Sequence, residues 1–181
     1  WPFMGVGAVQ FGIMYIAYIA SYQYLPAHLV VLFTVTTPLF ISIVNDIYER
    51  RFHAIYLCAA LIAVAAGAVV KYPDQPLSIS VAGIALVQVS NLSFAWGQVA
   101  YTRLAAPTAL KDREAFPFLY MGAAAVTALF ALASNPLTAA KISSFHWAAL
   151  MYLGLVASGL CFFLWNAGAR KVHKGRLAVM N

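Results

Sequence analysis

The chain has 181 residues, of which 64% are hydrophobic and only 9% are charged, and its formal net charge is +6. Soluble domains carry about 25% charged residues, so this composition excludes an ordinary soluble domain and indicates an all-α polytopic membrane protein. The basic residues stand in short clusters between apolar runs, which argues against a nucleic-acid-binding protein.

Six apolar stretches follow one another along the chain, each near the ~20 residues that a bilayer-crossing helix requires. We expect spans at 2–22, 27–48, 54–70, 79–101, 116–134 and 147–169, and the start of a seventh near Leu177. The connections between them are short and rich in turn-forming residues. The chain opens inside a helix-like run at Trp1 and stops at Asn181 in an apolar run that has only begun. We therefore expect an interior fragment of a longer chain.

The second predicted span contains Pro38, shortly after the threonines Thr34, Thr36 and Thr37. A proline inside a helix removes one backbone hydrogen bond and frees a carbonyl one turn back. Lipid cannot satisfy that carbonyl, so protein groups or cavity water must do so. A broken turn rich in hydroxyl groups near the middle of the membrane is a candidate substrate position. The alternative is a packing kink whose threonines bond back to their own helix.

The fourth predicted span carries several polar side chains inside an apolar run. They are Gln88, Ser90, Asn91, Ser93, Trp96 and Gln98. At helical spacing Gln88, Asn91 and Gln98 share one face. We expect the small Ala95 to leave room for a ligand beside that face, and Phe94 to wall it. Hydrogen bonding between helices is the alternative role for the amides.

The first and sixth predicted spans add further polar candidates. Gln10 stands in the apolar half of the first span, and Tyr15 and Tyr18 follow it. In the sixth span Asn166 follows Trp165, which we expect to anchor at the membrane interface. Asn166 either lines a cavity or caps the end of its helix. The predicted substrate-binding residues, with a helix break at Pro38, are Gln10, Tyr15, Thr34, Thr37, Asn91, Trp96, Asn166 and Asn181.

Lysine and arginine are distributed unevenly between alternate connections. The connections after the second, fourth and sixth spans hold Arg50, Arg51, Arg103, Lys111, Arg113, Arg170, Lys171, Lys174 and Arg176. The other side holds only Lys71 and Lys141. The positive-inside rule therefore predicts cytoplasmic loops near 50–53, 103–114 and 170–176.

A weak internal repeat relates the first span to the sixth. At an offset of 147 positions the matches include the pairs Gly7–Gly154, Gly12–Gly159, Tyr15–Phe162 and Thr34–Asn181. The loop after the first unit has no lysine or arginine, whereas its counterpart is basic, so we expect the two units to face opposite ways in the membrane. Secondary transporters built from inverted repeats bind substrate at the repeat interface.

Ionisable side chains avoid the middle of the predicted spans, because the five acids and four histidines all lie at span ends or in loops. A proton-coupled pump usually has an ionisable group inside the membrane. We therefore expect facilitated diffusion, or coupling through a segment outside this sequence. A membrane enzyme would need His, Asp, Glu or metal ligands that converge at one depth, so we expect neither an enzyme nor a metal or cofactor.

Several stretches resemble the EamA-type drug/metabolite transporter superfamily. They are the Pro-containing second span that ends in Glu49 and Arg50, the Phe94-Ala95-Trp96 turn, and the run 153–159. Within the carboxylate/amino acid/amine branch, the stretches 10–15, 32–40, 86–94, 156–168 and 175–181 are most similar to the bacterial biotin-transporting members.

This resemblance implies ten helices in two inverted halves, with the six spans as helices 3–8 and the seventh starting helix 9. Residues 1–72 would be the second part of the N-terminal half, and residues 77–181 the first part of the C-terminal half. The resemblance implies a bacterial inner-membrane carrier of biotin or a similar carboxylate or amine, and allows a homodimer. An amino-acid or metabolite exporter of the same superfamily is the alternative, and a structural membrane subunit is a third reading.

Overall fold

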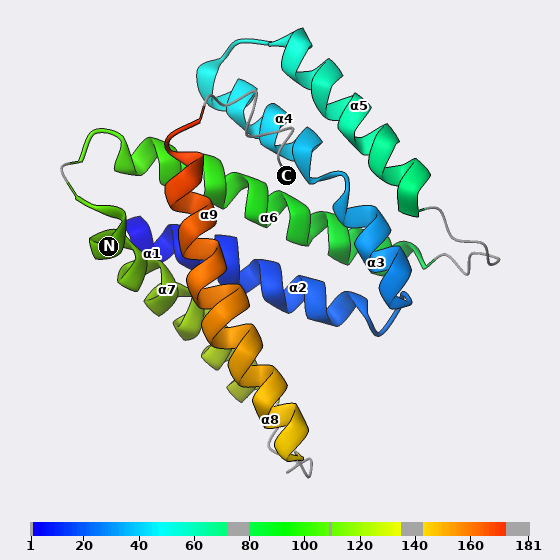
Figure 1. The fold of residues 1–181 in the computed structure, drawn as a ribbon, viewed down its shortest axis with the longest axis vertical. Helices are drawn as coiled ribbons and strands as arrows, with labels where there is room; N and C mark the ends of the chain where they lie inside the picture. The colour runs from blue at the N-terminus through cyan, green and yellow to red at the C-terminus, as the bar shows by residue number, and fades with distance from the viewer. Residues whose placement is uncertain (1, 72–79, 109, 135–142, 173–181) are drawn as a thin grey trace.

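The computed structural model describes residues 2–71, 80–108, 110–134 and 143–172, and within these ranges all regular structure is helical (Figure 1). The elements form six rods that follow one another along the chain. They are α1–η1–α2 (Pro2–Gly7, Ala8–Ile13 and Met14–Ser21), α3–α4 (Ala27–Thr34 and Thr37–Glu49), α5 (Ala54–Lys71), α6 (Val81–Ala105), α7 (Asp112–Ala133) and α8–η2–α9 (Ser144–Met151, Tyr152–Cys161 and Phe162–Ala169). The segments η1 and η2 are π-helical.

Each of the six predicted spans coincides with one of these rods, and the protein is a multi-pass membrane protein. Within the described part of the chain, four rods are long and apolar enough to cross a membrane: Pro2–Ser21, Ala27–Glu49, Asp112–Ala133 and Ser144–Ala169. The last two begin slightly earlier than predicted, at Asp112 and Ser144, because polar capping residues extend each helix beyond its apolar run. The predicted start of a seventh span and Asn181 lie outside the described residues.

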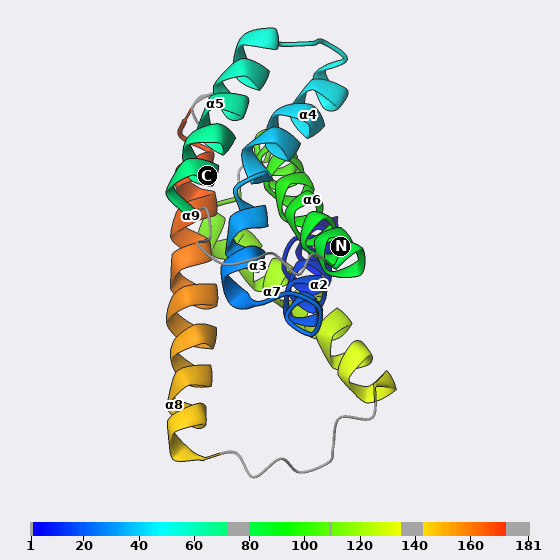
Figure 2. The ribbon, with the colours of Figure 1, turned by 90° about the vertical axis from the view of Figure 1, so that its right-hand side faces the viewer.

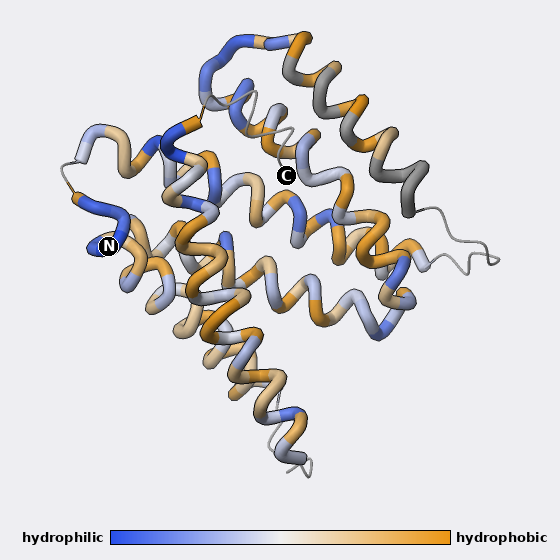
Figure 3. The backbone as a smooth tube through the Cα atoms, viewed as in Figure 1, coloured by the Kyte–Doolittle hydropathy of each residue, from blue (hydrophilic) through white to orange (hydrophobic). Residues whose placement is uncertain are grey.

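Helix α6 lies in the middle of the bundle, in contact with α1, η1, α2, α3, α4 and α9 (Figures 1 and 2). Helix α7 packs against α1 and η1, and α5 packs against α4 and α3. Hydrophilic residues gather in the connections and also interrupt α6 (Figure 3). The polar side chains of the fourth span are therefore enclosed by other helices, as their cost in lipid requires.

Glycines allow the first rod to touch its neighbours at backbone distance. A Cβ atom at Gly7 would lie 1.9 Å from the carbonyl oxygen of Leu119, and one at Gly122 would lie 1.9 Å from that of Met4. A Cβ atom at Gly97 of α6 would lie 2.2 Å from the Cβ of Gln10. Small residues at these crossings give the close contact that stabilises helix pairs in membranes. The first half of rod one is therefore clamped between α7 and α6.

The second rod is broken in the turn before Pro38. Helix α3 ends at Thr34 and α4 begins at Thr37, so Val35 and Thr36 form the break. Pro38 has no N–H to offer the Thr34 carbonyl, which instead accepts a hydrogen bond of 2.7 Å from the Thr37 hydroxyl. The hydroxyl of Thr34 donates to the carbonyl of Val31, also at 2.7 Å. These two bonds are those expected of threonines that satisfy their own helix.

Ionic contacts join the three connections that were predicted to share one side of the membrane. Glu49, at the end of α4, pairs with Arg103 of α6 at 3.2 Å. Asp112, at the start of α7, pairs with Arg170, just after α9, at 2.5 Å. The hydrogen bond with Asp112 raises the pKa of the Arg170 guanidinium, which remains charged. The ends of spans two, four and six therefore lie together at one end of the bundle.

Candidate functional site

A pocket of about 360 Å³ lies where four of the rods meet beside the break in the second. Its walls come from α2, α3–α4, α6 and α9, and they are polar on one side and aromatic on the other. The lining residues are Met14, Tyr15, Tyr18, Thr34, Thr37, Ser90, Asn91, Phe94 and Phe162. None of these residues carries a charge, so the described wall suits a neutral group that both donates and accepts hydrogen bonds.

Four of the eight predicted substrate-binding residues line this pocket, namely Tyr15, Thr34, Thr37 and Asn91. They come from three different rods and are up to 76 positions apart in the sequence. The structure therefore brings these four together. Their contact with a substrate remains a prediction.

The side chain of Asn91 fastens α6 to the broken turn. Its Nδ2 donates to the carbonyl oxygen of Phe33 at 2.9 Å and to the hydroxyl oxygen of Thr36 at 3.0 Å. Gln88 Oε1 lies 2.8 Å from the same hydroxyl. Thr36 does not line the pocket and instead belongs to this network. The amide N–H groups of Asn91 thus stabilise the break, while the residue itself borders the pocket.

An aromatic wall closes the other side of the pocket. The ring of Phe162 lies 6.1 Å from that of Tyr15, 5.9 Å from that of Phe94 and 5.2 Å from that of Phe11, measured between centroids. These distances are in the range at which aromatic pairs attract one another. The Tyr15 hydroxyl is 2.7 Å from Ser158 Oγ, which ties α2 to η2. Phe94 was predicted as a wall of the cavity, and it occupies that position.

Gln10 and Asn166, both predicted as substrate-binding, bind each other instead of lining the pocket. Gln10 Nε2 donates to Asn166 Oδ1 at 2.9 Å, and both side chains are fully buried. Asn166 Nδ2 donates to the carbonyl of Phe162 one turn earlier, at 2.9 Å. The Asn166 side chain is not among the residues that line this pocket, and its hydrogen bonds join the first and sixth rods. Among the described residues, Gln10 Oε1 has no hydrogen-bond partner.

Ala95 was expected to leave room for a ligand. Among the described residues there is no such room, because Ala95 is fully buried against Ile41 and Val44 of α4. Gln98 is likewise fully buried and lies outside the pocket. Trp96 faces another hollow of about 540 Å³, which it lines together with Arg103. The interpretation of Ala95 was wrong because its small side chain allows α4 to approach closely, rather than leaving space.

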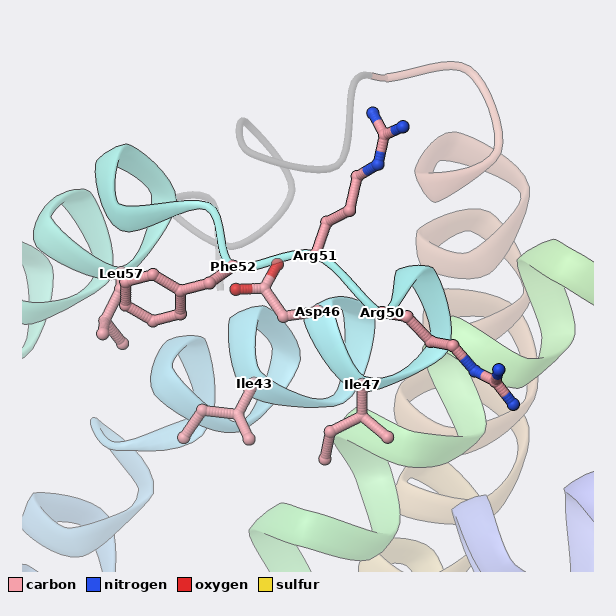
Figure 4. A pocket seen from close by; sticks show the side chains of 7 residues that line it. All are labelled: Ile43, Asp46, Ile47, Arg50, Arg51, Phe52 and Leu57. Carbon is pink, nitrogen blue, oxygen red and sulfur yellow. The ribbon is translucent and has the colours of Figure 1, made fainter.

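A further hollow, of about 350 Å³, lies at the end of α4 (Figure 4). Arg50 and Arg51 border it, but their side chains point in different directions. The carboxylate of Asp46 accepts hydrogen bonds from His53, at 3.0 Å from the backbone N–H and 2.8 Å from the ring Nδ1. Arg50 has a φ of 50°, the left-handed conformation that ends a helix. The two arginine side chains do not converge here, so we take the hydroxyl-rich pocket as the candidate functional site.

Sequence reasoning missed Met14, Ser90 and Phe162 as lining residues. For Phe162 a signal existed, because the repeat offset of 147 positions pairs it with Tyr15. Both members of that pair line the pocket. Ser90 was among the polar residues noted in the fourth span but was not assigned to the site, and Met14 is an ordinary residue of an apolar span that carries no signal.

The chain is similar to known biotin transporters. It is 40% identical to the biotin transporter of Salmonella typhimurium over 99% of this chain and 60% of that protein. The identity and coverage are the same for the biotin transporter of Escherichia coli (strain K12). The probable biotin transporter of Pseudomonas aeruginosa is 38% identical over 98% of this chain and 63% of that protein. The chain thus spans about three fifths of these relatives. No protein-family model matches it, and neither does any solved structure.

Proposed function

We propose that this chain is the central part of a secondary transporter or facilitator in a bacterial inner membrane, and that it carries biotin into the cell. The observation that carries the proposal is the pocket at the helix break, whose described wall is neutral, rich in oxygen atoms and aromatic. The similarity to biotin transporters over nearly the whole chain supports the choice of substrate.

The chemistry of biotin matches that wall. Its ureido group has two N–H donors and one carbonyl acceptor, and its sulfur-containing ring and side chain are apolar. Thr34, Thr37 and Asn91 offer oxygen atoms, while Phe94 and Phe162 offer apolar surface. The carboxylate of biotin needs a cation, a helix N-terminus or water, and it would lie away from these residues.

Two features support an arrangement of inverted repeats, in which the six rods are helices 3–8 of ten. Shifting η1 by the repeat offset of 147 positions places it at 155–160, inside the other π-helical segment, η2. The same offset exchanges two contacts, because Tyr15–Ser158 becomes Phe162–Phe11, and both contacts are present. When an offset turns each of two contacts into the other, the two units are related as they would be by a two-fold axis. Tyr15 and Phe162, which this offset pairs, both line the pocket, and transporters built from inverted repeats hold substrate at the repeat interface.

The orientation follows from the basic connections, which meet at one end of the bundle. We place that end in the cytoplasm by the positive-inside rule. Single cysteines at Asp74 and Asn135 should then react with an impermeant reagent from outside, whereas cysteines at His53, Ala109 and His173 should not. Reaction of both groups from one side would contradict the topology.

Transport fits the pocket better than catalysis does. Its described wall contains no His, Asp, Glu, Lys or Cys, so it offers no strong acid, base or nucleophile for hydrolysis or acyl transfer. A structural subunit would give no reason for a broken helix beside a pocket. An exporter of an amino acid or related metabolite would use the same architecture, and the direction of transport separates it from an importer.

The test is biotin uptake by the full-length protein. It is expressed in cells that lack both biotin synthesis and their own importer, and the initial uptake of labelled biotin is measured at nanomolar concentration. Uptake above that of the empty vector supports the proposal. Absence of uptake, with the protein present in the membrane, would overturn biotin as substrate and favour the exporter.

A further inference from the structure

We propose that Tyr18 donates the hydrogen bond that recognises the ureido carbonyl of the substrate, opposite acceptors supplied by Thr34, Thr37 and Asn91. This assignment rests on the proposed function and specifies which end of the molecule the pocket recognises. It follows from a count of the donors and acceptors that remain available in the pocket once the internal hydrogen bonds are made.

On the polar wall formed by α3, α4 and α6, the donor groups of Thr34, Thr37 and Asn91 are used in internal hydrogen bonds, and only their acceptor atoms remain for a ligand. The hydroxyl protons of Thr34 and Thr37 are both given to backbone carbonyls, so these residues present only oxygen lone pairs to a ligand. The Nδ2 group of Asn91 donates to the Phe33 carbonyl and to the Thr36 hydroxyl oxygen. Its Oδ1 accepts no hydrogen bond from any described residue. Thr34, Thr37 and Asn91 can therefore receive N–H groups but have no free proton to donate to a carbonyl.

Tyr18, on α2, supplies the missing donor. Its hydroxyl oxygen accepts a hydrogen bond of 2.9 Å from the Tyr22 hydroxyl, and its own proton goes to no described residue. The Tyr15 hydroxyl is instead held in a hydrogen bond of 2.7 Å with Ser158 Oγ, in which either oxygen can be the donor. Ser90 is the other hydroxyl in the pocket that is without a described partner, but the residue is only 3% exposed. Tyr18 thus offers the accessible proton.

This arrangement matches a cyclic urea. One carbonyl oxygen is flanked by two N–H groups, so the molecule needs one donor on one side and acceptors on the other. The pocket offers the donor from the first rod and the acceptors from the second and fourth. A site built to hydrogen-bond such a group rejects analogues that lack it, because buried polar partners are then left unpaired.

The experiment compares Tyr18→Phe with Tyr22→Phe in the full-length protein. Tyr18→Phe keeps the ring, which packs edge-on against Tyr22 at 5.3 Å between centroids, and removes only the donor. Tyr22→Phe removes the contact between the two hydroxyls but leaves the Tyr18 proton. We expect Tyr18→Phe to raise the KM for biotin uptake about tenfold, and Tyr22→Phe to change it by less than about twofold.

A second measurement does not depend on the amount of protein. Competition by 2-iminobiotin, which carries an imino group in place of the carbonyl, is measured against biotin in each variant. We expect the original protein to prefer biotin, and Tyr18→Phe to lose that preference by about the factor by which its KM rises. Tyr18→Leu should give the same ratio, and Tyr22→Phe should keep the original one.

Equal behaviour of Tyr18→Phe and Tyr22→Phe would overturn the assignment. So would an unchanged preference for biotin in Tyr18→Phe, or a loss of preference in Ser90→Ala alone. In all three cases biotin uptake by the original protein would still stand. Absence of uptake by the original protein would instead overturn the proposed function, and the role of Tyr18 with it.

Discussion

The two halves of the first rod meet their neighbours in opposite ways. In the half that begins at Pro2, Gly7 lies so close to α7 that a single methyl group would collide with its backbone. In the other half, Met14, Tyr15 and Tyr18 border a pocket of about 360 Å³. The first half therefore forms a closed contact on its Gly7 face, while Pro2, Gly5 and Val6 on another face border the hollow beside Trp96. The second half leaves space beside the helix break, although both halves belong to one apolar span.

Polar groups follow the same division. In the closed half, Gln10 is fully buried and pairs with Asn166. Beside the open half, Thr34 and Thr37 of the second rod donate their hydroxyl protons to their own backbone and line the pocket with the remaining oxygen lone pairs. The comparison teaches that a polar residue inside a span can reach a ligand only where the neighbouring helices leave room for one. Where they do not, it serves to join helices.

The largest effect is expected from a side chain placed in the closed contact. Gly7→Val would bring a Cβ atom to within 1.9 Å of the Leu119 carbonyl, so α1 and α7 must separate. We expect a loss of about 3 kcal/mol or more in stability, seen as low membrane abundance and a lower unfolding temperature in detergent. Gly5→Val is the matched control on the same helix, because no atom lies within 4 Å of its Cβ position. Equal abundance of the two variants would contradict the closed contact.

An intermediate effect is expected from the buried amide pair. Gln10→Leu leaves the Asn166 amide buried without its partner, which costs about 1–3 kcal/mol. Removing both polar groups, with Gln10→Leu and Asn166→Leu together, should restore much of the loss. Thermal unfolding in detergent measures the stability, and uptake per molecule measures the function. If Gln10→Leu instead weakens biotin affinity at normal stability, Gln10 belongs to the binding site and the division between the two halves is wrong.

The smallest effects are expected from the threonines of the broken turn. Thr34→Val and Thr37→Val each remove one acceptor from the pocket, and we expect uptake per molecule to fall about fivefold, equivalent to about 1 kcal/mol. Thr36→Val, outside the pocket, should lower abundance more than uptake per molecule. Thr37→Val also leaves the Thr34 carbonyl without its partner, so its abundance should fall slightly. Lower abundance with unchanged uptake per molecule in all three variants would mean that these threonines serve only the fold.

The sequence by itself determined the class of protein, the six helices and the position of the break. These features are local. An apolar run of about 20 residues must satisfy its own backbone in lipid, and it does so as a helix. Pro38 prevents one backbone hydrogen bond whatever surrounds it. The distribution of lysine and arginine likewise placed three connections on one side, and these connections contact one another in the structure.

Only the tertiary structure decided which polar residues face a pocket. Gln10 and Asn166 are 156 positions apart, and neither helical spacing nor the repeat offset of 147 pairs them. Ala95 was expected to leave space, but the close approach of α4 fills it. Periodicity places a residue on a face of its helix, but the packing of the other helices decides whether that face meets a side chain, a backbone or a cavity. This is why Thr34, Thr37, Asn91 and Tyr15 line the pocket, whereas Gln10, Trp96 and Asn166 do not.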